Sequence, residues 1–206
     1  MTTAPAAVTR QEHRAARGPE GNERLTAATG TVLLVLFAVQ GFTILSLTRL
    51  LTVHIFVGLL LTGPVALKIG STCYRAVRYY TGAASYRRKG APPMPLRLLG
   101  PLLVLTSAAV LTTGITLALL GRGRTADQVL FLHKASFVLW VGLAGIHVLV
   151  HLWRLPRLVV SDLRRDAVAG RGLRWALLAA ALGAGLAVAL LGVHLVSGWT
   201  PGHVGR

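Results

Sequence analysis

Four nitrogen-bearing side chains inside apolar segments share one spacing. His133 and His147 are 14 residues apart, and so are His54 and Lys68. In an α-helix, 14 residues make almost four turns and rise about 21 Å, so the two members of each pair lie on one helix face at well-separated heights. Imidazole and neutral amine nitrogens are metal ligands, and such groups are costly inside a membrane unless they have partners. The spacing therefore predicts two binding levels stacked along a helix bundle.

The elements that must position these residues are long apolar segments. The chain has 206 residues, 53% hydrophobic composition, a mean hydropathy of +0.62 and only six acidic side chains, which is typical of a membrane protein. Five stretches are long enough to cross about 30 Å of hydrocarbon. They cover residues 26–48, 51–76, 98–120, 128–153 and 174–197. We expect an all-α integral membrane protein, with a four-helix bundle over 26–153 and the fifth span as an accessory helix.

The formal charge of +16 is better explained by a membrane than by nucleic acid. Lys and Arg collect on the cytoplasmic side of membrane proteins. With the N-terminus inside, sixteen of the 22 basic residues fall in the cytoplasmic segments 10–24, 75–97 and 154–174. This predicts a cytoplasmic N-terminus and an extracytoplasmic C-terminus. The predicted segments outside the spans include a disordered tail over 1–25, a cytoplasmic loop over 154–173 and an extracytoplasmic tail over 198–206. High Ala, Leu, Arg and Gly usage without an organelle presequence favours a bacterial plasma membrane.

The second and fourth spans run in the same direction across the membrane. His54 and His133 are therefore expected at one depth near the outer face, and Lys68 and His147 at one depth farther in. Two facing imidazoles are what a six-coordinate haem iron requires, since the porphyrin occupies four of its six positions. For any one of these histidines, a simple hydrogen bond across the bundle is the alternative.

Small residues repeat the interval on the other two helices. Gly100 and Gly114 are 14 apart on the third span, and Ala27 and Gly41 are 14 apart on the first. A flat porphyrin laid against a helix needs a missing side chain, although glycine also aids ordinary helix packing in membranes. Cys73 is the single cysteine and no C-x-x-C-H motif occurs, so any haem must be non-covalent haem b.

These residues resemble the N-terminal four-helix bundle of the transmembrane cytochrome b superfamily. The resemblance spans roughly residues 26–153, including HIFVGLLLTGPVALK and HKASFVLWVGLAGIH. It implies that His54 and His133 ligate an outer haem and that His147 is one ligand of an inner haem. Lys68 stands where that family has a fourth histidine. Three outcomes are open: its neutral amine ligates iron, it extends to the inner surface, or it pairs with a haem propionate. The last two leave the inner site five-coordinate or empty.

Further polar residues flank the predicted levels. Arg75 and Arg78 fall where the second span leaves the membrane, within reach of inner propionates, although an ordinary positive flank also explains them. His151 follows His147 by one turn and is a candidate contact for a propionate, a quinone or a partner protein, although an interfacial histidine that faces water explains it equally well. His194 near the outer end of the fifth span is better explained as an interfacial side chain.

The pattern predicts an electron-transfer cytochrome with one or two haems, acting as a subunit or partner of a membrane oxidoreductase or quinol-linked chain. Its expected partners are the lipid bilayer, a redox protein and, as a further candidate, a quinone; no nucleic acid is expected. The chain lacks a nucleotide-binding fingerprint, so it is not a complete flavin- or nicotinamide-dependent reductase. The alternative is a haem-free channel, transporter or scaffold subunit whose His and Lys residues line a proton or ion path. The lack of Asp or Glu within any predicted span weighs against that alternative.

Overall fold

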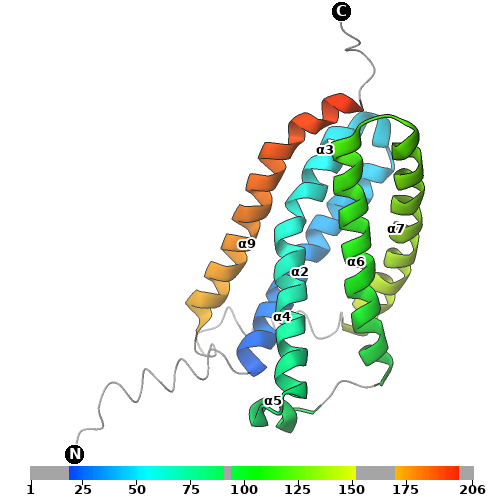
Figure 1. Ribbon diagram of the computed structural model, residues 1–206. Coiled ribbons are helices and arrows are strands. Elements are labelled where there is room, and N and C mark those ends of the chain that lie inside the picture. Colours follow the sequence, from blue (N-terminus) through cyan, green and yellow to red (C-terminus); the bar gives the residue numbers. More distant parts are fainter. Residues whose placement is uncertain (1–18, 91–93, 152–169, 200–206) are drawn as a thin grey trace, which may run out of the picture.

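The computed structural model describes residues 19–90, 94–151 and 170–199. All regular secondary structure in these ranges is helical. Five helices are long and apolar enough to cross a membrane, and they span Pro19–Ile44, Leu47–Tyr80, Met94–Leu120, Arg124–His151 and Arg171–Gly198. Figure 1 shows them running up and down beside one another. The predicted all-α architecture with five long apolar helices is confirmed for the described part of the chain.

The second and fifth spans are each divided into two elements. In chain order the elements are α2 (Pro19–Ile44), α3 (Leu47–Leu60), α4 (Thr62–Tyr80), the short α5 (Ala84–Arg88), α6 (Met94–Leu120), α7 (Arg124–His151), α9 (Arg171–Gly192) and the 3₁₀ helix η1 (Val193–Gly198). We call the half of the bundle that contains the α2–α3 and α6–α7 turns the upper half, as it is drawn in Figure 1.

The predicted disordered tail over residues 1–25 is wrong for its last part, because α2 begins at Pro19. Proline suits the first turn of a helix, and Glu20 lies near the positive end of the helix dipole. Lys89 pairs with Glu20 at 3.9 Å and also with Glu23. These ion pairs join the first turns of α2 to the segment that follows α5. Residues 1–18 of the predicted tail lie outside the described residues, as do most of the loop over 154–173 and positions 200–206.

The helix of the second span is interrupted at Leu61, where α3 ends and α4 begins. Pro64 has no backbone N–H, so the carbonyl of Leu60 lacks its helical partner. The backbone of α9 passes close to this point: a side chain at Gly185 would collide with the Leu60 carbonyl, and one at Gly63 would collide with the Ala181 carbonyl. Small residues four apart in membrane helices allow such backbone contact. The crossing of α4 and α9 thus depends on glycine.

The layout differs from a four-helix bundle with an accessory fifth helix. The α9 helix packs along α3 and α4 and also contacts α2, whereas α6 and α7 pack mainly against each other. Figure 1 shows α9 on the side of α3 and α4 opposite the α6–α7 pair. The Ala- and Gly-rich sequence of α9 explains this packing, because small side chains let the helix approach both α3 and α4 closely. Its partners α3 and α4 carry His54 and Lys68.

The core lies between α2 and the α3–α4 span. Its buried members are Leu33, Val57, Leu61 and Val65. Large apolar side chains also cover the outside of the bundle, among them Phe42, Leu105, Phe131, Leu149 and Leu190. Such an apolar exterior is stable when hydrocarbon rather than water surrounds it.

Candidate functional site

The two histidines of α7 lie on its more protected face. Ser136, Phe137 and Trp140 are partly buried with His133 and His147, whereas most residues between them are exposed. This is the helical period of three to four residues that the 14-residue spacing implies. The protected face is turned toward the interior of the molecule, although α7 makes close backbone contact mainly with α6.

His54 is held in the upper half by two side chains of α2. Thr43 Oγ1 lies 2.8 Å from His54 Nδ1. Gln40 Nε2 lies 3.2 Å and 3.3 Å from the two ring nitrogens and donates to the His54 carbonyl at 3.1 Å. The Oε1 atom of Gln40 is buried and has no hydrogen-bond partner within the described residues. Neither Gln40 nor Thr43 was predicted from the sequence.

His133 is held in a matching way by α6. Thr113 Oγ1 lies 3.0 Å from His133 Nδ1. The ring rests on Gly114, where an added Cβ would lie only 3.1 Å from His133 Cε1. Gly114 therefore leaves space that the His133 imidazole itself occupies, whereas the sequence pattern predicted that this glycine makes room for a porphyrin.

His54 and His133 both lie in the upper half of the bundle, on α3 and α7. The two rings are near enough to interact electrostatically, although α3 and α7 are not packed against each other. They come from helices that run in the same direction (Figure 1). Two imidazoles from separate helices, with a glycine beside one of them, fit the donor set of haem b. The described residues contain no cluster of three or more His, Cys, Asp or Glu side chains that could hold a bare metal ion.

Lys68 and His147 form a second, less symmetrical pair lower in the bundle. They also interact electrostatically, but Lys68 Nζ donates to the Thr26 carbonyl of α2 at 2.7 Å. An added Cβ at Gly30 would lie 3.0 Å from Lys68 Nζ, so this glycine, which was not predicted, makes room for the amine. Ser71 accepts a hydrogen bond from Asn22 through its carbonyl at 3.1 Å. Lys68 thus belongs to a polar contact between α2 and α4.

His147 is stacked on His151, which follows it by one turn. Their ring centroids are 4.4 Å apart with an interplanar angle of 26°. His151 Nδ1 lies 2.9 Å from the His147 carbonyl, so that nitrogen carries the proton and donates. This stack fixes the direction of the lower imidazole.

Most of the other predicted residues show no contact with the four candidate ligands His54, Lys68, His133 and His147. A Cβ added at Gly41 or Gly100 would meet no atom of another described helix within 4 Å. Arg78 lies 6.0 Å from the ring centroid of Tyr86 and thus faces α5, while Arg75 is partly buried. Ala27 is buried. Of the three predicted glycines, Gly114 is the one at which an added Cβ would contact a candidate ligand.

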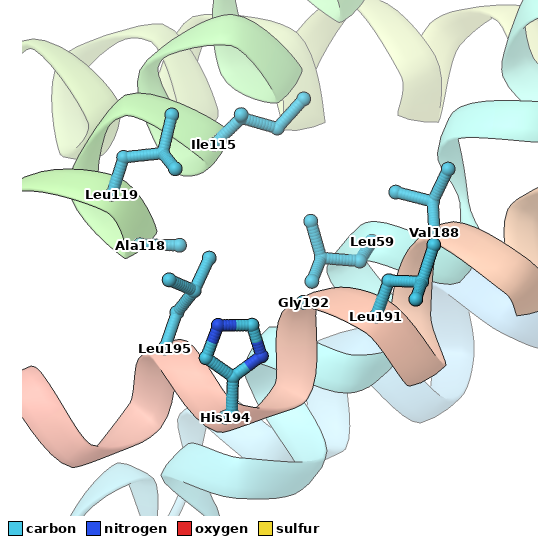
Figure 2. Close-up of a pocket in the computed structure, with 9 residues that line it drawn as sticks. All are labelled: Leu59, Ile115, Ala118, Leu119, Val188, Leu191, Gly192, His194 and Leu195. Carbon is cyan, nitrogen blue, oxygen red and sulfur yellow. The ribbon is translucent and has the colours of Figure 1, made fainter.

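An apolar cavity of about 400 Å³ lies between α3, α6, α9 and η1. Figure 2 shows its lining of aliphatic residues, with His194 as the polar side chain among them. His194 was predicted as an interfacial residue, and it is exposed. The cavity contains neither member of the His54–His133 pair in its lining.

Comparison with known proteins matches this chain to no family model, no curated protein and no solved structure.

Proposed function

We propose that the protein is a membrane-embedded b-type cytochrome that passes electrons across the bilayer through one or two haems. The observation that carries this proposal is the pairing of His54 and His133. These imidazoles come from two helices, lie within electrostatic range of each other and each have a threonine on Nδ1. That leaves the Nε2 atoms as the nitrogens available to iron.

The chain's own residues would supply ligation, orientation and exclusion of water. His54 and His133 would hold haem b from its two faces, and Gly114 would keep the adjoining surface of α6 free of a side chain. Bound haem supplies one-electron iron chemistry, whose potential depends on axial ligands, burial and hydrogen bonds. The apolar exterior keeps this site within the bilayer.

The upper level has the better support of the two. Lys68 Nζ already has an acceptor in the Thr26 carbonyl, so ligation opposite His147 would require the amine to leave that contact and lose its proton. We infer one haem at the upper level and a second one only where Lys68 can exchange partners. The proposed setting is a bacterial plasma membrane with the N-terminus cytoplasmic, a redox partner protein at each face and a quinone as a candidate electron donor.

The test is spectroscopic. The full chain is expressed with haem supplementation and purified in detergent, and the reduced-minus-oxidised spectrum and haem-to-protein ratio are recorded. We expect the Soret and α bands of a low-spin b haem, and we expect His54→Ala and His133→Ala to lose them. His194→Ala is the matched control and should keep them. Absence of both bands in the wild-type protein would overturn the proposal and favour a haem-free membrane protein.

A further inference from the structure

We propose that Thr43 and Thr113 are positioning residues that hold His54 and His133 in the tautomer with Nδ1 protonated and Nε2 bare. The inference rests on the proposed function, because an unprotonated Nε2 has a lone pair that can bind the haem iron. It adds two residues from α2 and α6 to a site whose predicted ligands lie on α3 and α7.

The tautomer of His54 follows from the hydrogen bonds of Thr43. Thr43 Oγ1 lies 2.6 Å from the Gln40 carbonyl and 2.8 Å from His54 Nδ1. A carbonyl oxygen can only accept, so the single hydroxyl proton of Thr43 is directed to Gln40. Thr43 Oγ1 must then accept from His54, which places the ring proton on Nδ1. Thr43 is almost fully buried, with 1% of its surface exposed, so water does not compete for this bond.

Thr113 imposes the same tautomer on His133. Its hydroxyl lies 2.6 Å from the Ala109 carbonyl, which accepts the proton, and 3.0 Å from His133 Nδ1. Both upper histidines therefore direct a ring N–H at a threonine oxygen whose own proton is already used.

Gln40 leaves the Nε2 lone pair of His54 accessible. Its amide nitrogen is almost equidistant from the two ring nitrogens, at 3.2 Å and 3.3 Å. The lone pair of Nε2 points outward in the ring plane, and an atom on that axis would lie much farther from Nδ1 than from Nε2. Gln40 Nε2 is therefore off the axis on which a metal would bind, while its bond to the His54 carbonyl fixes the amide orientation.

The chemical consequence is a more basic pair of ligands in a fixed orientation. A hydrogen bond from the distal N–H of a ligating histidine fixes its tautomer, raises its basicity and favours the more highly charged ferric iron. Loss of such a partner typically costs about 10- to 100-fold in metal affinity. We expect the same range for haem binding at the upper level.

The experiment compares isosteric variants in the full-length protein. Thr43→Val and Thr113→Val remove the hydroxyl, and Thr43→Ser and Thr113→Ser restore it. Thr31→Val on α2 and Thr116→Val on α6 are the controls, because these hydroxyls bond to the carbonyls of Ala27 and Thr112 in their own helices. We measure the haem dissociation constant, the midpoint potential of the upper haem and, in haem-free protein, the ¹⁵N shifts of the histidine side chains.

We expect the valine variants to bind haem about 10- to 100-fold more weakly and to have a higher midpoint potential, with both changes reversed by serine. The haem-free wild-type protein should show His54 and His133 protonated at Nδ1. Valine variants that match their controls in affinity and potential would overturn the inference. A wild-type protein that binds no haem would instead overturn the proposed function, and the ¹⁵N shifts would still report whether the threonines set the tautomer.

Discussion

Phe37 of α2 and Trp140 of α7 are in contact, with ring centroids 4.5 Å apart and an interplanar angle of 52°. Trp140 is seven residues from both His133 and His147, which places it about 10 Å along the helix from each. Its indole N–H also donates to Ser107 Oγ of α6 at 2.9 Å. The aromatic contact therefore lies between the upper and lower pairs and joins α7 to the first helix.

Replacing Trp140 should loosen the attachment of α7, since this helix has few other contacts beyond α6. Trp140→Phe keeps an aromatic ring but loses the bond to Ser107, and we expect the free energy of unfolding to fall by about 0.5–1.5 kcal/mol. Trp140→Ala should cost more, because the contact with Phe37 is lost as well. Denaturant unfolding in mixed micelles measures both. Trp175→Phe on the exposed face of α9 is the control, and an equal loss in that variant would contradict the role given to Trp140.

The close crossing of α4 and α9 predicts very different costs for two neighbouring glycines. At Gly185 an added methyl group would collide with the Leu60 carbonyl, whereas at Gly183 it would meet no atom of another described helix within 4 Å. Gly185→Ala should lower the free energy of unfolding by about 1–3 kcal/mol, as overpacking typically does. Gly183→Ala should be neutral or stabilising by up to about 1 kcal/mol. Thermal unfolding in one detergent compares them, and similar midpoints would show that α9 does not pack as described.

The sequence predicts those features that depend on a regular period. Five apolar segments and the 14-residue interval place His133 and His147 on one protected face of α7 without any tertiary information. Contacts between helices are less predictable: the bonds of Lys68 to Thr26 and of Trp140 to Ser107 depend on helix rotation and separation, which hydropathy does not specify. Thr113 directly precedes the predicted Gly114 and could have been identified as a site residue on that basis. No sequence pattern marks Thr43 in the same way. The ion pairs of Lys89 with Glu20 and Glu23 in the first turns of α2 join residues far apart in the chain, and hydropathy does not predict them.

Ionisation of Tyr86, near the lower end of the bundle, is expected to lower the stability of the fold at alkaline pH. It is 3% exposed, packs edge-on to Tyr74 with ring centroids 6.2 Å apart, and burial raises the pKa of its phenol. The folded protein thus holds the phenolic proton more tightly than the unfolded chain does. This contribution to stability is complete below the ordinary tyrosine pKa of about 10 and is lost as the pH rises above it.

We therefore expect the thermal midpoint of the wild-type protein to fall as the pH rises above about 10, and Tyr86→Phe to make that fall smaller. Tyr80→Phe is the control, because Tyr80 is largely exposed. An equally steep fall in the Tyr86→Phe protein would show that another group causes the alkaline loss.

Under the proposed function, the residue at position 68 sets the number of haems, and a histidine in place of Lys68 should raise that number. In the wild-type protein, Lys68 Nζ is bonded to the Thr26 carbonyl, so we expect a haem-to-protein ratio near one and a spectrum that Lys68→Met leaves unchanged. Lys68→His offers an imidazole opposite His147 and should bring the ratio toward two, with a second low-spin signal in electron paramagnetic resonance. Lys134→His, at an exposed position of the same helix as His147, should add no haem. If the wild-type protein binds two haems and Lys68→Met loses one, the lysine is itself an iron ligand and its bond to Thr26 is given up on haem binding.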